Sequence, residues 1–271
     1  MRSRTARELI ALNTAFYADH AESFSATRSA PWEGWRRVLE VARELGALDG
    51  REPFVLDLAC GNLRFERFLA DELKPAVARV DALDNCPDLA GGADIPGATL
   101  HDVDILSQLM ETGREAPQQD GAAAAAARTR LSPLTDPCDL AVCFGFMHHV
   151  PGADLRRCVV DELVARTRPG GVVAISLWLF MNDERLARKA LAADAAASQS
   201  APWPGFDASE LEPGDHFLGW QGEDGPLRYC HHFEEEEVDA LTARADAVEA
   251  ARFSADGASG DLNRYLILRR L

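Results

Sequence analysis

The sequence lacks the features that would place it in a membrane or along a nucleic acid. No run of about 18 apolar residues is present, and the N-terminal stretch has no long apolar segment like that of a secretory signal. Lysine occurs only at Lys74 and Lys189, and the formal net charge is −16. Nucleic-acid binding relies on cationic side chains that displace phosphate counterions, so this charge argues against a chain that wraps nucleic acid unaided. We expect a cytoplasmic protein without membrane contact, in which clustered arginines supply any basic face.

The sequence also lacks a C-x-x-C pair. Its six cysteines are scattered, and several lie in apolar runs, where free thiols pack as small hydrophobic groups. The stretches "MHHV" and "CHHF" offer metal-ligand types, but neighbours along a strand point to opposite faces and do not easily share one ion. We therefore predict neither a disulfide framework nor a metal site. The residues concerned are Cys60, Cys86, Cys138, Cys143, Cys158, Cys230, His148, His149, His231 and His232.

What is present is an alternation of apolar runs and helical patterns, which indicates βαβ units and a mainly parallel sheet. We predict strands at the start of 54–65 and within 78–84, 98–105, 138–146 and 171–178, and helices over 154–168 and 234–245. Two closely connected strands, 247–254 and 262–268, are expected to pair antiparallel. The fold class predicted is α/β, a Rossmann-like doubly wound sheet of seven strands with a C-terminal antiparallel hairpin.

One domain is predicted over residues 1–271, with two insertions. The segment 107–137 is alanine-rich, of low complexity and flanked by proline, so we predict a disordered surface insertion. The segment 181–226 follows the fifth predicted strand and combines a helix with an aromatic-rich loop, so we predict a lid.

Three acids follow three successive predicted strands. Asp57, Asp84 and Asp104 each end an apolar run, and ligands of doubly wound sheets bind where loops leave the carboxyl ends of the strands. Carboxylates there accept hydrogen bonds from an ammonium group, a ribose diol and an adenine amine, all of which S-adenosylmethionine contains. A nicotinamide dinucleotide would instead require a G-x-G-x-x-G turn, and here only Gly61 is present.

These motifs together resemble the class I S-adenosylmethionine-dependent methyltransferases. "VLDLACG" is similar to their first motif, "VDALDNC" to the acid of the second strand, "TLHDVDI" to the adenine-flanking acid, and "TRPGGVVAIS" to the turn into the fifth strand. The family's usual first turn has glycine at the positions of Ala59 and Leu63. The resemblance implies S-adenosyl-L-methionine as cofactor, bound by Tyr17, Asp57, Ala59, Gly61, Asn62, Asp84, Asn85, Asp104, Ile105 and Phe144.

The flanks resemble a narrower group, the tRNA methyltransferases that esterify 5-carboxymethyluridine at the wobble position. The stretches that carry this resemblance are "AFYADHAESFSATRSAPW", "DLAVCFGFMHHV", "GGVVAISLWLFMND", "RYCHHFEEEEVDAL" and "GDLNRYLILRR". It implies that Arg28, Trp32, His148, His149, Trp178, Asn263 and Arg264 face the substrate pocket, with Arg28, Trp32, His149, Trp178 and Arg264 as the expected catalytic set. It also implies two partners, a tRNA substrate and a small zinc-binding activator protein at the edge of the sheet.

The expected chemistry requires no general base, because a carboxylate is already ionised at neutral pH. Arginine fixes such a group by a two-pronged contact, and tryptophan stacks on a flipped-out base. Two other functions stay open from the sequence. A methyltransferase for a small acid or other metabolite agrees with the acidic net charge, and a non-catalytic cofactor-binding subunit agrees with the unusual turn at Leu63.

Overall fold

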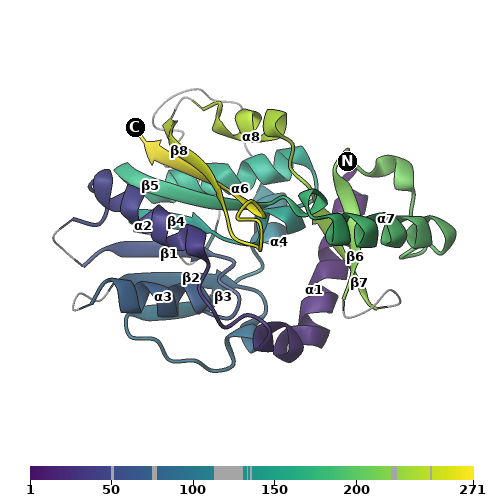
Figure 1. The fold of residues 1–271 in the computed structure, drawn as a ribbon, viewed down its shortest axis with the longest axis horizontal. Coiled ribbons are helices and arrows are strands. Elements are labelled where there is room, and N and C mark those ends of the chain that lie inside the picture. Colours follow the sequence, from purple (N-terminus) through teal and green to yellow (C-terminus); the bar gives the residue numbers. More distant parts are fainter. Residues whose placement is uncertain are drawn as a thin grey trace.

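The structure is a computed structural model that describes residues 1–49, 52–74, 78–112, 131–132, 134, 136–220, 225–244 and 246–271. Its centre is a seven-stranded sheet with the strand order β3-β2-β1-β4-β5-β9-β8 (Figure 1). Strands β1 to β5 are parallel, whereas β9 runs antiparallel to β5 and to β8. The strands are β1 Phe54–Leu58, β2 Arg79–Asp84, β3 Ala98–Asp102, β4 Cys138–Cys143, β5 Thr167–Trp178, β8 Ala247–Ala255 and β9 Asn263–Arg270. The predicted fold class is confirmed.

Helices cover both faces of this sheet, since alternate residues of each strand point to opposite sides. Leu56 and Leu58 of β1 belong to the apolar core that also holds residues of α4, α6 and α8, whereas Val55 packs into the core beneath α2 and α3. The helices are α1 Ser3–Ala26, α2 Glu33–Glu44, α3 Arg64–Glu72, α4 Ile105–Thr112, α6 Ala153–Arg166, α7 Glu184–Gln199 and α8 Glu235–Thr242. Single turns of 3₁₀ helix are η1 Pro87–Ala90, η2 Met147–His149, η3 Phe180–Asn182 and η4 Ala208–Glu210. Within the described part of the chain, no helix is both long and apolar enough to cross a membrane.

The predicted insertion 107–137 is too wide at both ends. Its first residues, up to Thr112, complete α4, whose Leu109 is buried, and Leu131 lies in the same core at the other end. Both side chains remove apolar surface from water, which explains why these ends are ordered. The alanine-rich part of the predicted insertion, residues 113–130, lies outside the described residues.

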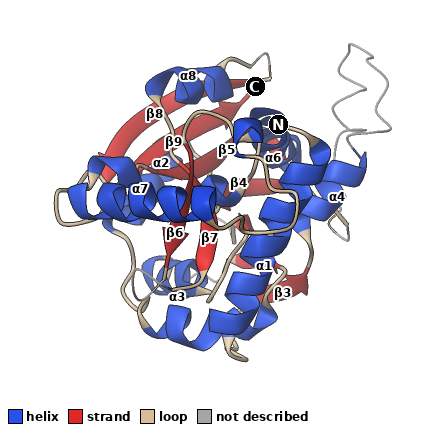
Figure 2. Cartoon of the chain, turned by 90° about the vertical axis from the view of Figure 1, so that its right-hand side faces the viewer, coloured by secondary structure: helices blue, strands red, loops and turns tan. Residues whose placement is uncertain are grey.

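The second predicted insertion, 181–226, forms more structure than a helix and a loop. It contains η3, α7, η4 and strand β6, Asp215–Gly219, which pairs antiparallel with β7, Leu227–His231, in a separate two-stranded sheet. This small sheet packs on α1 through Leu9, Phe217 and Tyr229, so the first and last thirds of the chain meet there (Figures 1 and 2). The lid function of the segment stays a prediction.

Candidate functional site

The turn between β1 and α3 has an unusual backbone. Ala59, Gly61 and Leu63 adopt positive φ values of 66°, 58° and 55°. This left-handed region favours glycine, because in any other residue Cβ comes too close to the following carbonyl oxygen. Leu63 compensates for its strain by packing, because its side chain is buried in the core below α2 and α3. The alternating left-handed residues turn the backbone N–H of Gly61 toward Asp84 and leave an open concave wall at the carboxyl end of β1.

The three strand-end acids lie on this wall, as the strand order requires, but each has a different environment. Asp84 is buried, its Oδ2 accepts from Gly61 N at 2.9 Å and its Oδ1 accepts from Cys86 N at 2.9 Å. Burial raises the pKa of Asp84, and these backbone donors oppose the shift. Asp104 is exposed and accepts from both the N–H and the hydroxyl of Ser107, as a cap on α4. Asp57 is buried, and its Oδ1 has no hydrogen-bond partner in the described chain.

One cavity of about 330 Å³ connects these acids with the substrate residues predicted from the sequence. Its size is that of a site for a small cofactor or substrate. Of the predicted residues, it is lined by Tyr17, Arg28, Trp32, Asp57, Ala59, Gly61, Asn62, Asp84, Asn85, Asp104, Ile105, Phe144, His148, His149, Trp178 and Asn263.

Arg264 is the predicted catalytic residue that the fold does not bring to this cavity. Its guanidinium forms an ion pair with Glu235 of α8 instead. The reason is the period of two along β9, which sends Asn263 and Arg264 to opposite faces of the strand. Asn263 faces the cavity and donates its amide to Asp256 at 2.8 Å.

One part of the cavity wall is cationic and aromatic. Arg28 and Arg228 both line it, and neither has a carboxylate within ion-pair distance among the residues that the structure describes. The Arg28 guanidinium lies 3.6 Å from the ring centre of Phe24, and that of Arg228 lies 5.6 Å from the rings of Trp178 and Trp220. Burial and the neighbouring Arg228 lower the pKa of Arg28 to about 10. Two uncompensated guanidinium groups with apolar walls favour an anion in this part of the cavity.

Arg228 was not among the residues predicted from the sequence. The stretch "RYCHHF" did stand out as a motif, but its first residue points into the cavity only because β7 pairs with β6 and leans on α1. The side chain is 6% exposed, and its Nε has no hydrogen-bond partner in the described chain. A buried and incompletely paired guanidinium beside a cavity is a strong indication of a ligand contact.

His149 is held by the protein on both sides of its ring. Nδ1 lies 2.9 Å from the carbonyl oxygen of Tyr229, which can only accept, so Nδ1 carries the hydrogen and Nε2 accepts from the Tyr17 hydroxyl at 2.7 Å. Burial, followed by the charge of Arg228, lowers the pKa of His149 to about 3. The imidazole is therefore neutral and positions Tyr17 at the cavity wall.

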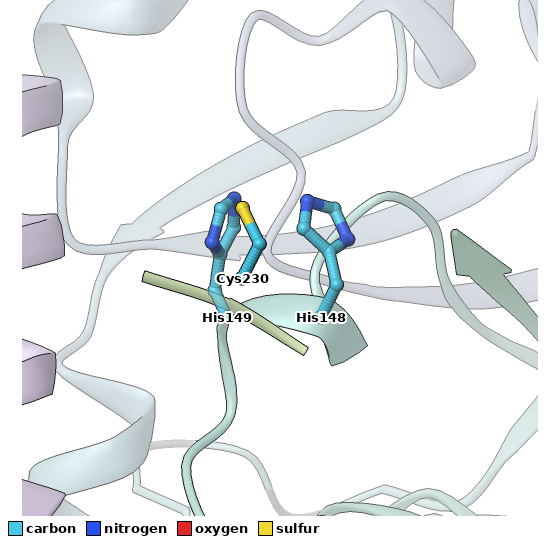
Figure 3. A group of neighbouring side chains, drawn as sticks. All are labelled: His148, His149 and Cys230. Carbon is cyan, nitrogen blue, oxygen red and sulfur yellow. The ribbon is translucent and has the colours of Figure 1, made fainter. Parts of the chain in front are cut away.

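The two adjacent histidines do not lie on a strand, so the argument that sent them to opposite faces is wrong. They belong to the 3₁₀ turn η2, where their ring centres are 4.0 Å apart, and candidate ligand atoms of His148, His149 and Cys230 lie within 4.8 Å of one another (Figure 3). Burial lowers the pKa values of both histidines most, and the charges of Arg228 and Arg28 lower them further. The same positive charges oppose a cation, so the group is better suited to an anion.

Comparison with known proteins shows which solved structures share this architecture. No protein-family model and no curated protein matches the sequence. A structure of S-adenosylmethionine-dependent methyltransferases from Methanosarcina mazei aligns with a TM-score of 0.54 at 15% identity, over 82% of this chain and 94% of the other. A 1,6-didemethyltoxoflavin N1-methyltransferase from Burkholderia thailandensis, with its substrate and S-adenosylhomocysteine bound, aligns with a TM-score of 0.53 at 14% identity, over 100% and 91%.

The chain has the fold of the class I methyltransferases. An amino pentose methyltransferase from Micromonospora echinaspora, with S-adenosylmethionine bound, shares it with a TM-score of 0.50 at 16% identity, over 92% of this chain and 96% of the other. In this fold the first turn, between β1 and α3, and the acid that ends β2 border the same edge of the sheet, which is where the cavity opens.

Proposed function

We propose that the chain is an S-adenosylmethionine-dependent methyltransferase that esterifies a carboxylate, and that its acceptor is 5-carboxymethyluridine at the wobble position of tRNA. The observation that supports a carboxylate acceptor most directly is the pair Arg28 and Arg228, both unopposed by acids in the described chain and near each other in the cavity wall. This part of the wall is the acceptor end, and the part that contains Asp57 and Asp84, the cofactor end, suits the donors of the cofactor.

The residues of the cofactor end match the polar and apolar groups of this ligand. Asp84 uses one lone pair on each oxygen for the turn, which leaves acceptor capacity for a ribose hydroxyl. Asp57 lines the cavity with a carboxyl group that suits an ammonium group. Ile105 and Leu106, buried at the start of α4, give an apolar wall for adenine. The cofactor supplies an electrophilic methyl group on a sulfonium.

The acceptor end supplies orientation rather than proton transfer. With the cofactor bound, its methyl group would pass to a carboxylate oxygen, the O–CH₃ bond forming as the S–CH₃ bond breaks, to give a methyl ester and S-adenosylhomocysteine. No proton moves, in agreement with a His149 whose two ring nitrogens are both engaged. Two guanidinium groups hold the carboxylate, and Trp178 offers a face for the base, so that positioning provides most of the acceleration.

The test is the nucleoside content of tRNA from a strain that lacks the gene. We expect the methyl ester of 5-carboxymethyluridine to be absent by mass spectrometry and the free acid to accumulate. Complementation with the wild-type chain should restore the ester, and complementation with Arg228→Ala should not. An unchanged nucleoside profile in the deletion strain would contradict the tRNA assignment.

A small carboxylic acid is the second candidate acceptor, favoured by the net charge of −16, which repels a polyanion. Purified chain that forms S-adenosylhomocysteine from small acids in the absence of tRNA would support it. Cofactor binding without turnover on either acceptor would instead indicate a non-catalytic subunit.

We also propose the small zinc-binding activator protein as a partner at the free edge of β3. This strand ends the sheet, and its Leu100 is 36% exposed, the kind of edge that another chain can extend. Such a partner could supply the cationic surface that this chain lacks for tRNA. Full activity of the isolated chain on tRNA would contradict this requirement.

A further inference from the structure

Asp57 does not face the cavity alone. Behind it, on the inner face of α3, lies Glu66, which is 1% exposed and does not line the cavity itself. Both oxygens of Glu66 and Oδ1 of Asp57 lack a hydrogen-bond partner in the described chain, although the two carboxyl groups are within hydrogen-bonding reach of each other. Ionised carboxylates only accept, so the two can bond to each other only if one of them holds a proton.

We propose that Asp57 and Glu66 share one proton when the cofactor site is empty, and that the ammonium group of the cofactor displaces this proton on binding. The proposal goes beyond methyl transfer and rests only on the use of S-adenosylmethionine, not on the identity of the acceptor. Asp57 contacts the ammonium, and Glu66 is a positioning residue that acts through Asp57. The proton leaves to solvent, and the positive ammonium takes over as the partner of the carboxylate pair.

The surroundings of the pair support this exchange. Burial, followed by the charges of Glu66 and Asp84, raises the pKa of Asp57 well above its usual range, and burial raises the pKa of Glu66 to about 7. Among the described residues, the titratable groups that act on the pair are acidic or neutral apart from one arginine at the outer face of α3. They are Asp84 of β2, Cys60 of the turn, Cys143 of β4 and the cation Arg67. Without a ligand, a second negative charge here has no compensation.

The consequence is a cofactor affinity that depends on pH. At pH values below the pKa at which the pair loses its shared proton, binding must expel that proton, so the affinity for the cofactor rises about tenfold per pH unit. Above this pKa the affinity levels off. This is the direction expected for groups whose pKa is raised in the free protein and lowered by a bound cation.

The experiment is calorimetric titration with S-adenosylhomocysteine, which has the same ammonium group, in buffers of different ionisation enthalpy between pH 6 and 8. We expect release of about one proton per ligand near pH 6, falling toward pH 8. Glu66→Gln should abolish the release and flatten the pH dependence. Glu72→Gln, on the outer side of the same helix where Glu72 pairs with Arg36, should retain both.

A second readout covers the case in which Glu66→Gln does not fold. In the wild-type protein, the infrared band of a protonated carboxyl group should disappear when S-adenosylhomocysteine is added. Tight binding with no proton released and no loss of this band would overturn the shared proton while leaving the methyltransferase proposal intact. Absence of binding would overturn both.

Discussion

The Tyr17 hydroxyl lies 2.7 Å from Nε2 of His149, and this contact joins α1 to the 3₁₀ turn after β4 at the wall of the cavity. Removing the hydroxyl by Tyr17→Phe leaves a buried imidazole nitrogen without a donor. We expect a loss of about 1–3 kcal/mol in the free energy of unfolding, measured by urea denaturation. An unchanged unfolding midpoint would show that water replaces the hydroxyl.

Arg228 should decide whether a carboxylate is accepted. Arg228→Ala is expected to remove most methyl transfer while S-adenosylhomocysteine affinity stays within about twofold, because Arg228 forms no ion pair with the acids of the cofactor end in the described chain. Arg228→Lys should recover only part of the activity, since an ammonium lacks the planar fork of guanidinium. Arg264→Ala is the matched control, because that arginine pairs with Glu235 outside the cavity. Full transfer by Arg228→Ala beside loss in Arg264→Ala would contradict the assignment.

Arg28 is expected to act with Arg228 on the same anion. Single-turnover transfer by Arg28→Ala should fall as steeply as that by Arg228→Ala, and the double variant should lose less than the product of the two effects. His149→Gln offers the contrast, because both ring nitrogens of this imidazole are engaged by protein groups. A silent Arg28→Ala together with complete loss of transfer in His149→Gln would favour an acceptor that needs a base.

Asp84 should contribute to cofactor affinity. Asp84→Asn removes one acceptor and places an amide donor opposite a backbone N–H, so we expect affinity for S-adenosylhomocysteine to fall by about 1–3 kcal/mol. Asp102→Asn serves as control, since Asp102 is an exposed acid that ends β3 outside the cavity. Equal calorimetric affinities for wild type and Asp84→Asn would remove Asp84 from the site.

His231 should make stability depend on pH. Burial lowers the pKa of His231, but hydrogen bonds with Asp215 and Glu237, each at 2.7 Å, outweigh it and leave the pKa raised. A raised folded-state pKa means that the stabilisation is complete below the unfolded value of about 6.5 and is lost as pH rises through the folded value. His231→Gln should flatten this decline in unfolding free energy, whereas His20→Gln, at a half-buried position of α1 without an ion pair in the described chain, should not. The same dependence of unfolding free energy on pH in both variants would show that His231 is not its source.

Two glycine substitutions in the turn between β1 and α3 should change stability in opposite directions. Left-handed backbone costs an L-residue about 1–2 kcal/mol, and glycine loses about 0.5–1 kcal/mol in chain entropy, so Ala59→Gly should raise stability by up to about 1 kcal/mol. Leu63→Gly removes a buried side chain and should lower stability by several kcal/mol. Thermal unfolding of both variants distinguishes this account, and a stabilised Leu63→Gly would contradict it.

The parts of the fold that were predictable are those that depend on local pattern. Apolar runs ending in acids located β1, β2 and the convergence of Asp57 with Asp84, because parallel strands share one carboxyl edge. The strands β6 and β7 were not predicted, since their five-residue sequences mix polar and apolar residues and their pairing depends on α1, more than 200 positions away for Asn13 and Tyr229. The position of Arg228 in the cavity wall was not predicted for the same reason. The side-by-side placement of His148 and His149 was also missed, because it depends on a single 3₁₀ turn.

The guanidinium of Arg228 comes from the small sheet, whereas the acids of the cofactor end come from the large one. Part of the acceptor end is therefore encoded by a stretch of the gene separate from the stretches that encode the acids of the cofactor end. Exchange of the segment from η3 through β7 would alter which molecule is methylated and leave the source of the methyl group unchanged. New substrate preferences could arise in this scaffold through recombination confined to that segment, without passing through intermediates that have lost cofactor binding.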